Sequence, residues 1–331
     1  MFRLLVVARS FGYASTKAID ELSAISDLRL TMPQHSRAFN ESEMLELVPG
    51  QDMVIVGTDQ MSARVLEASP DLKVVSKHGV GIDNIDVVAA TRAGVLITYL
   101  PGFNSSAVAD MALALMLTLS RRVCEAADRT KAGSWGKILG HDVWGKTLGV
   151  IGTGRIGQEV IRRALSFEMK VVAFDTFPSK QAAATLGYQY VSLDELLERS
   201  EIITIHVPLT PETRNMIGAR ELGMMREAAL LINTSRGGIV DERALIKSLE
   251  TGGIGGAAID VFEETLRQSD KVKTLPNLIV TPHIAAYTYE TLEFMDVTLV
   301  AECRRLLRGE KPEYTVNPEI WDKVKDRVRV F

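Results

Sequence analysis

The sequence predicts an α/β protein built from two doubly wound parallel-sheet domains. Short runs of β-branched residues alternate with helix-like segments along nearly the whole chain. The runs are apolar throughout, which is typical of strands that are covered by helices on both faces of a parallel sheet. At 331 residues the chain is also too long for one typical hydrophobic core, so two domains are expected.

The expected strands form two series separated by a Pro-Gly interruption. Pro101 and Gly102 follow Tyr99, and we place the first domain boundary there. The strands before it are Leu4–Ala8, Leu28–Thr31, Met53–Val56, Lys73–Ser76 and Val95–Thr98. Those after it are Thr147–Ile151, Val171–Phe174, Ile202–His206, Leu230–Asn233, Ala257–Asp260 and Leu278–Thr281.

The segment Ser105–Arg122, directly after the boundary, predicts a long helix. Its residues are apolar nearly all round, so the helix must be buried. The sequence leaves open whether it is buried inside the monomer or in a subunit interface.

Composition narrows the class of protein. The net charge of −4 gives no basic footprint for nucleic acid and no polybasic patch for a membrane surface. The two cysteines, Cys124 and Cys303, form no disulfide framework, which favours a reducing compartment. The longest apolar stretch, Ala107–Leu119, contains Asp110 and is too short to span a bilayer. We therefore predict a cytoplasmic protein without a membrane segment.

A glycine-rich loop follows the strand Thr147–Ile151 and opens a helix expected over Gln158–Ser166. The motif is GxGxxG, in which Gly152 permits a tight turn and Gly154 lets a pyrophosphate approach the backbone. Gly157 lets the helix pack against the strand, and the helix N-terminus offers free N–H groups to phosphates. The motif predicts a bound dinucleotide.

Asp175 ends the next strand and favours NAD as that dinucleotide. A carboxylate there accepts hydrogen bonds from the adenosine ribose and repels a 2′-phosphate. Lys180 lies nearby and weakens the distinction from NADP. The alternative, a glycine-rich turn with a helix-capping aspartate, is disfavoured by the order strand, loop, helix, strand and acid.

Two side chains follow strands at the edge where open parallel sheets bind ligands. Arg236 follows the strand Leu230–Asn233, and His283 follows Leu278–Thr281. Reduction of a keto acid needs a cation for the substrate carboxylate and an acid for the carbonyl oxygen. From position alone, Arg236 can equally be a solvated loop residue and His283 a structural histidine. The five histidines show no metal-ligand spacing, so no metal is expected.

From about residue 45 to 315 the chain resembles the D-isomer-specific 2-hydroxyacid dehydrogenases, in particular the phosphoglycerate dehydrogenase-like branch. The shared motifs are Lys77–Asp86, Asn104–Asp110, Gly152–Gly157, His206–Thr210, Asn233–Asp241, Gly256–Phe262 and Thr281–Ala286. The implied fold has two Rossmann/flavodoxin-like domains, with the cofactor domain inserted into the substrate domain. We therefore expect a substrate domain at 1–99 and 290–331, and an NAD-binding Rossmann domain at 100–289.

The resemblance also implies roles for individual residues. Arg236 resembles the residue that binds the substrate carboxylate and polarises the keto oxygen, and His283 resembles the general acid/base. Asp260 is similar to an aspartate near the nicotinamide carboxamide, while Val80 and Gly81 match a loop whose N–H groups hold the carboxylate. Further cofactor contacts are predicted at Arg155, Ile156, Val207, Pro208, Thr213, Thr234 and Ala285, and further substrate contacts at Lys77 and Asn104.

The third catalytic residue of the family is a glutamate in a V-F-x-x-E-P stretch, and here the pattern is blurred. Counted strictly, Thr265 occupies its position and the proline is missing. If the loop is one residue shorter, Glu264 takes the role, which is the interpretation we prefer. Glu263 and Glu264 can also be a solvated acidic pair.

The substrate is left open as well. Phosphoglycerate enzymes often carry an arginine after the strand that is Met53–Val56 here, where this chain has Gly57 and Thr58. Phosphate binding would then depend on Lys77, His78 or Arg64, and Lys77 can equally be a surface lysine. The acid can be 3-phosphoglycerate/phosphohydroxypyruvate or glyoxylate/hydroxypyruvate, and its physiological direction is not fixed.

The resemblance thus implies an NAD-dependent D-2-hydroxyacid dehydrogenase. The segment after Pro101 and Gly102 usually builds a dimer interface in this family, so a homodimer is expected. One alternative is an NAD(H)-sensing binding protein of the corepressor type, which no basic patch or peptide-binding extension favours. Another is a formate- or phosphite-type oxidoreductase on the same fold, although its hallmark pocket residues are not evident.

Overall fold

Parallel strands flanked by helices form both units of the chain in a computed structural model that describes residues 1–330. The outer unit comprises residues 1–104 together with the segment from Thr288 onward, and the inserted unit comprises residues 105–287. The expected boundaries were 99/100 and 289/290.

The outer unit contains a five-stranded parallel sheet in the order β2-β1-β3-β4-β5. Phe2, Leu4 and Val6 of β1 face one hydrophobic core, while Leu5 faces the other, as the two-residue period of a strand requires. The strands are β1 (Phe2–Val6), β2 (Leu28–Thr31), β3 (Met53–Val56), β4 (Val74–Lys77) and β5 (Leu96–Thr98).

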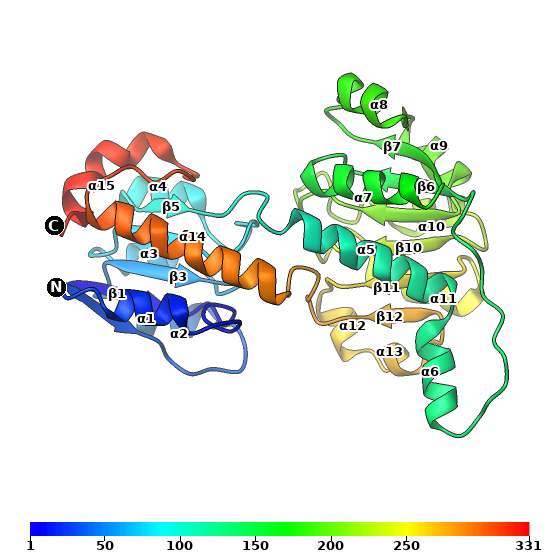
Figure 1. Ribbon diagram of the computed structural model, residues 1–331, viewed down its shortest axis with the longest axis horizontal. Coiled ribbons are helices and arrows are strands. Elements are labelled where there is room, and N and C mark those ends of the chain that lie inside the picture. The colour runs from blue at the N-terminus through cyan, green and yellow to red at the C-terminus, as the bar shows by residue number, and fades with distance from the viewer. Residues whose placement is uncertain (331) are drawn as a thin grey trace. The chain divides into compact units, whose positions relative to one another are not determined.

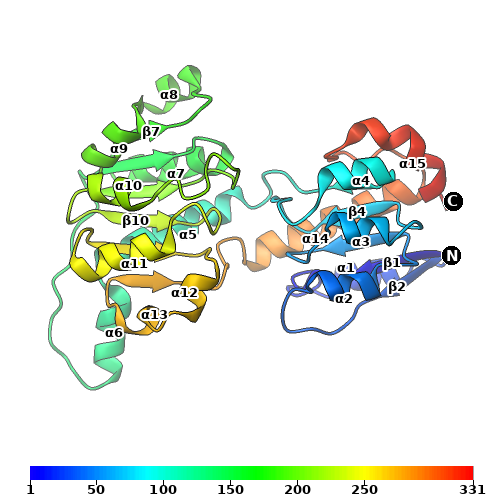
Figure 2. The same cartoon turned by 180° about the vertical axis from the view of Figure 1, so that it is seen from behind.

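Helices cover both faces of this sheet (Figures 1 and 2). The first core is closed by α1 (Lys17–Ser23), α14 (Tyr289–Leu307) and α15 (Trp321–Val328), with a short 3₁₀ turn at Pro318–Ile320. The second core is closed by α2 (Glu41–Leu47), α3 (Ala63–Glu67) and α4 (Val87–Ala93).

The inserted unit contains a seven-stranded parallel sheet in the order β12-β11-β10-β9-β6-β7-β8. The predicted strands all agree with observed ones to within two residues at each end. The short strand β8 was not predicted, because two residues give no periodicity. The strands are β6 (Thr147–Ile151), β7 (Lys170–Phe174), β8 (Gln189–Tyr190), β9 (Ile202–Ile205), β10 (Leu230–Asn233), β11 (Gly256–Ile259) and β12 (Leu278–Val280).

Helices also cover both faces of the inserted sheet. One face carries α5 (Ser105–Ser120) and α7 (Arg155–Ser166), which begins three residues earlier than predicted. The other face carries α9 (Leu193–Arg199), α10 (Ala219–Met224), α11 (Glu242–Thr251) and α12 (Glu264–Gln268). Helix α8 (Lys180–Leu186) follows β7, and α13 (Lys271–Thr274) precedes β12.

The helix predicted over 105–122 ends at Ser120. Arg122 adopts a left-handed conformation with φ of 52°, and α6 (Val123–Lys131) starts after it. The apolar residues of α5 pack against α7, β10 and β11, so its burial is explained within the inserted unit. In contrast, α6 buries none of its residues and projects from the sheet (Figure 1).

Each sheet has a point at which the strand order reverses, between β1 and β3 in the outer unit and between β6 and β9 in the inserted unit. Ligands of open parallel sheets bind beyond the carboxyl ends of the strands at such points. No helix in the described part of the chain is long and apolar enough to cross a membrane.

Candidate functional site

The three glycines of the GxGxxG loop meet the three spatial demands predicted for them. Gly152 has φ of +92°, and a Cβ on it would lie 2.7 Å from the carbonyl oxygen of His206. A Cβ on Gly157 would lie 2.0 Å from the Gly152 carbonyl oxygen, so only glycine lets α7 approach the strand. Gly154 faces open space, with no atom within 4 Å of the Cβ position. That space at the N-terminus of α7, beside Arg155 and Ile156, fits a pyrophosphate.

Asp175 follows β7 at the same edge, and three protein donors hold its carboxylate. Oδ2 accepts hydrogen bonds from the Thr153 N–H at 2.7 Å and the Thr153 hydroxyl at 2.9 Å. Oδ1 accepts one from the Phe177 N–H at 2.8 Å. Because a carboxylate has about four acceptor positions, one remains on Oδ1 for a ribose hydroxyl.

The loop after β9 carries His206, Val207 and Pro208. The Nε2 atom of His206 lies 2.9 Å from the Thr204 hydroxyl, and burial lowers the pKa of this histidine to about 3. The imidazole is therefore neutral at pH 7. The Thr213 hydroxyl donates to the Pro208 carbonyl at 2.7 Å and closes the loop.

Two buried polar atoms at this edge have no hydrogen-bond partner among the described residues. They are Nδ1 of His206 and Oγ1 of Thr234, which directly follows β10. Unpaired buried polar atoms are rare and costly, so these two are available to bond a polar ligand at this edge. The residues present therefore fit a dinucleotide such as NAD.

Arg236 lies in a turn that is organised by Asn233. The Asn233 side chain accepts hydrogen bonds from the Ser235 N–H and hydroxyl at 3.0 and 2.6 Å, and it donates to the Arg236 carbonyl at 3.0 Å. A Cβ on the next residue, Gly237, would lie 2.8 Å from the carbonyl carbon of Phe262. Glycine thus lets this turn pack on the loop after β11.

His283 follows β12 and adopts a left-handed backbone conformation, with φ of 59°. Such a conformation is strained in a residue with a side chain and persists only where the surroundings fix it. Its N–H donates to the Asp260 carbonyl at 2.9 Å. The buried Asp260 carboxylate accepts from the Thr281 hydroxyl at 2.6 Å and from the N–H groups of Ile284 and Ala285 at 2.9 Å each. Asp260 therefore holds the whole backbone around His283.

Glu264 begins α12 with an exposed side chain. Its Oε1 accepts a hydrogen bond from Gln268 at 3.0 Å, while Glu263 pairs with Arg214 at 3.0 Å. Thr265 is half-buried. The buried Glu242 fixes this loop by accepting from the N–H groups of Glu263 and Leu266. The choice between Glu264 and Thr265 as supporter of His283 stays a prediction.

The outer unit positions the predicted substrate loop at the end of β4. Lys77 is buried, so the alternative of a surface lysine is wrong. Its ammonium donates to the Gly57 carbonyl and to Asn84 Oδ1 at 2.7 Å. Val80 and Gly81 follow and are half-buried, and Asn104 is the last residue of this segment of the unit.

His78, next to that loop, belongs to a network that the sequence did not reveal. Its Nδ1 lies 2.7 Å from the Ser10 hydroxyl, and its Nε2 lies 2.8 Å from Asp296 Oδ1. Asp296 Oδ2 accepts from the Gly12 N–H at 3.0 Å. The one available signal is Asp296 itself, an acid close in sequence to the apolar residues Met295 and Leu299.

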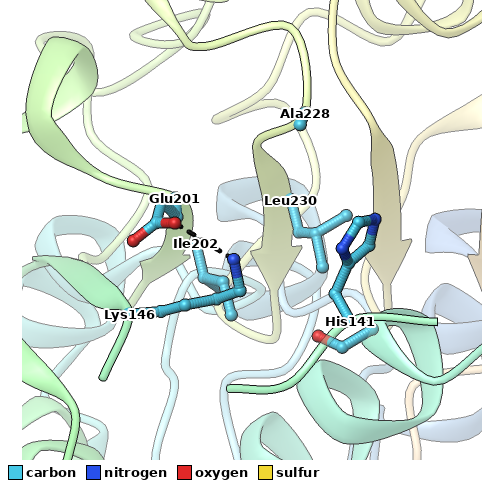
Figure 3. Close-up of a pocket in the computed structure, with 7 residues that line it drawn as sticks. His141, Lys146, Glu201, Ile202, Ala228 and Leu230 are labelled. Carbon is cyan, nitrogen blue, oxygen red and sulfur yellow. Dashed lines mark hydrogen bonds and ion pairs between the residues drawn. The ribbon is translucent and has the colours of Figure 1, made fainter. Parts of the chain in front are cut away.

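A small pocket of the inserted unit lies at the opposite, amino end of the strands (Figure 3). Its ion pair joins the Lys146 ammonium to Glu201 at 3.0 Å. Burial raises the pKa of Glu201, but the Thr147 N–H and Lys146 outweigh it and lower the pKa. None of the predicted site residues lines this pocket. The lining residues are Ser120, His141, Lys146, Glu201, Ile202, Ala228 and Leu230. Among the described residues no cluster could hold a metal.

Comparison with known proteins matches residues 113–285 to the family model described as D-isomer specific 2-hydroxyacid dehydrogenase, NAD binding domain. A glyoxylate reductase of Korarchaeum cryptofilum is 42% identical over 275 residues, which cover 81% of this chain and 83% of that protein. A D-3-phosphoglycerate dehydrogenase of Methanocaldococcus jannaschii is 40% identical over 281 residues, which cover 84% of this chain. The match spans 54% of that longer relative.

Solved structures give the same result. D-lactate dehydrogenase from Aquifex aeolicus, complexed with NAD and lactic acid, superposes with a TM-score of 0.82 at 31% identity. The match covers 93% of this chain and 96% of that one.

Proposed function

The chain belongs to the D-isomer specific 2-hydroxyacid dehydrogenase family, and we propose that it uses NADH to reduce a small 2-keto acid without a phosphate group. Family membership confirms the predicted enzyme class, fold class and cofactor. Glyoxylate and hydroxypyruvate are the acids that fit the proposal. The corepressor and formate- or phosphite-type alternatives gain no support from the relatives.

The proposal depends on one observation: the three side chains that could bind a phosphate, Lys77, His78 and Arg64, already have partners. The Lys77 ammonium is bound to Gly57 and Asn84, and His78 is bound to Ser10 and Asp296. The exposed Arg64 pairs with Glu41 at 2.8 Å. A phosphate would therefore have to compete with existing partners at each of these three side chains. We keep the prediction that Lys77 contacts the substrate, but only for the carboxylate group of the substrate.

The proposed chemistry assigns one task to each side chain. Arg236 binds the keto-acid carboxylate, since a guanidinium matches a carboxylate with two parallel hydrogen bonds. Val80 and Gly81 of the outer unit stay predicted contacts of a substrate carboxylate through their N–H groups. His283 donates a proton to the carbonyl oxygen as the carbon is reduced. Bound NADH supplies the hydride.

Glu264 is proposed to support His283. A carboxylate near an imidazole favours its protonated form, which the reduction consumes. Glu264 begins a helix whose first turn is anchored by Glu242, and its exposed side chain would have to leave Gln268 to reach His283. We keep it ahead of Thr265, because a threonine carries no charge.

We also propose that two copies associate through the segment around α6, which comprises α6 and the residues that follow it up to Leu139. Trp135 and Leu139 are 84% and 88% exposed, and no residue of α6 is buried. Exposed large apolar side chains on a projecting segment are typical of an interface. The segment lies next to α5, where the sequence placed the dimer contact. The cytoplasm remains the proposed location.

The experiment is to follow NADH oxidation at 340 nm with glyoxylate, hydroxypyruvate, pyruvate and phosphohydroxypyruvate. We expect kcat/KM to be highest for glyoxylate or hydroxypyruvate and at least about tenfold lower for phosphohydroxypyruvate, since an uncompensated phosphate costs more than 1.4 kcal/mol. The reverse order would refute the small-acid proposal.

Arg236→Gln and His283→Asn test the assigned roles. We expect each variant to lose at least about a hundredfold in kcat/KM, because His283 supplies proton donation and Arg236 supplies the charge-assisted hydrogen bonds to the substrate carboxylate. NADH binding, followed by fluorescence, should persist in both. Arg199→Gln, which removes an exposed arginine paired with Glu195, is the matched control. Full turnover in both site variants would contradict the assignment.

A further inference from the structure

We propose that the hydroxyl groups of Tyr188, Tyr190 and Thr153 form a directed chain that fixes the Asp175 carboxylate and thereby sets the preference of the site for NAD over NADP. The inference rests on the NAD-dependent activity proposed above. The sequence pointed to Asp175 alone, and the three hydroxyl residues are not explained by the chemistry at Arg236 and His283.

The two tyrosines lie at β8, the edge strand that pairs with β7. Tyr190 pairs with Ala173, two residues before Asp175. Because side chains two residues apart share a face of a strand, Tyr188 and Tyr190 project to the same side. Their rings meet edge to face with centroids 5.3 Å apart, and their hydroxyls lie 3.0 Å apart. The Tyr190 hydroxyl reaches Thr153 Oγ1 at 2.7 Å.

The direction of every hydrogen bond in the chain follows from the carboxylate. Asp175 can only accept, so the Thr153 hydroxyl spends its single proton on Oδ2 at 2.9 Å. Thr153 Oγ1 must then accept from Tyr190. The Tyr190 proton is thereby committed, so Tyr190 accepts from Tyr188 and also from the Ser179 N–H at 3.1 Å. All three hydroxyl dipoles point toward the negative charge.

Such a chain strengthens its terminal bond, because each hydroxyl that donates becomes a better acceptor and polarises the next. Burial raises the pKa of Tyr188, with the neighbouring Tyr190 adding to the shift, so Tyr188 keeps its proton and remains a donor at neutral pH. The outcome is a carboxylate that does not rotate.

The Tyr190 hydroxyl joins the two loops that surround the adenosine ribose in dinucleotide-binding folds. Thr153 lies inside the GxGxxG loop, and Ser179 ends the loop that leads from Asp175 to α8. Tyr190 is bonded to both, so it ties the loop that leads to α8 to the GxGxxG loop. A 2′-phosphate would therefore meet the Asp175 carboxylate in a fixed orientation.

The experiment replaces Tyr190 with phenylalanine, which removes the hydroxyl and keeps the ring. Binding of NADH and of NADPH is titrated by fluorescence without a keto acid, and kcat/KM is measured with each cofactor. We expect the Kd for NADH to rise about fivefold, the effect of one lost hydrogen bond of about 1 kcal/mol, while the Kd for NADPH stays level or falls. The kcat at saturating NADH should not change, because the hydride-transferring groups are untouched.

Thr153→Val should shift the preference further, and Tyr188→Phe should shift it less, because they remove bonds nearer to and farther from Asp175. Tyr289→Phe, at an exposed tyrosine of the outer unit, is the matched control. An unchanged NADH/NADPH preference in folded Tyr190→Phe and Thr153→Val, with only a lower Tm, would overturn the inference and leave the dehydrogenase intact. A parent chain that binds neither dinucleotide would overturn both.

Discussion

Asp260 shows how one buried carboxylate can organise the backbone around His283, the proposed general acid. The resemblance placed it near the nicotinamide, but its oxygens are directed to Thr281, Ile284 and Ala285. Three charge-assisted hydrogen bonds at a fully buried site outweigh the strain of the left-handed His283 backbone. Asp260 is therefore a positioning residue for His283, whatever it also contacts in the bound cofactor.

His206 gives a prediction at the same scale. Its folded pKa of about 3 lies below the ordinary value of 6.5, so the unfolded chain binds a proton between these values that the native chain does not. Lowering the pH from 6.5 toward 4.5 should therefore cost about 2 kcal/mol of stability through this residue alone, and nothing above pH 7. Urea unfolding of His206→Gln should show a flatter pH dependence. His141→Gln, at an exposed histidine, should not, and equal slopes in all three proteins would contradict the assignment.

Single residues could be predicted from the sequence where the pattern forces a backbone geometry. Gly152 and Gly157 are examples, since their Cβ positions are occupied by backbone atoms. Partners distant in sequence could not be predicted. Nothing local connects Thr153 with Tyr190, or Glu242 with the loop at Glu263, because these contacts depend on strand order and loop paths.

At the scale of elements, the loop after β4 depends on helix α14. His78 is held from one side by Ser10, which follows β1, and from the other by Asp296 of α14. Three segments of the outer unit therefore fix the residue two positions before Val80. These contacts restrict the movement of the predicted substrate loop at Val80 and Gly81.

Asp296→Ala tests that dependence. It leaves the His78 Nε2 and the Gly12 N–H without their acceptor, which should cost about 1–3 kcal/mol and lower Tm by several degrees. We expect the KM for the keto acid to rise about tenfold through the disordered loop. The Kd for NADH, which binds the inserted unit, should not change. Glu293→Ala, at an exposed acid of the same helix, is the control, and an unchanged KM at lowered Tm would reduce the network to a purely structural role.

The apolar strands of both sheets were predicted, while the two-residue strand β8 and the long helix α14 were not. The buried strands are uniformly apolar, so composition located them to within two residues. β8 and the break between α5 and α6 escaped, because a two-residue strand and a left-handed Arg122 leave no periodic signal. The blurred V-F-x-x-E-P stretch shows the same limit, since the position of Glu264 depends on loop length rather than on pattern.

At the scale of the whole molecule, the exposed segment around α6 predicts the oligomeric state. Light scattering after gel filtration should give about twice the monomer mass of 36.4 kDa. The double variant Trp135→Ala/Leu139→Ala removes the two most exposed large apolar side chains of the segment and should shift the mass toward the monomer. Phe177→Ala, at an equally exposed residue distant in sequence, should remain dimeric. A parent chain that is monomeric at micromolar concentration would contradict the proposed association.

Because the inserted unit interrupts the outer unit in sequence, the two units are completed at different times during synthesis on the ribosome. Residues 105–287 form one continuous stretch, so this unit can complete its sheet as soon as it has left the exit tunnel. The outer sheet has by then been synthesised but lacks α14 and α15, which cover one of its faces. The Gly12 N–H gains its acceptor only when Asp296, 284 residues later in the chain, has been synthesised. The N-terminal strands are made first yet finished last, and their uncovered apolar face is the part of the nascent chain that most needs protection from aggregation.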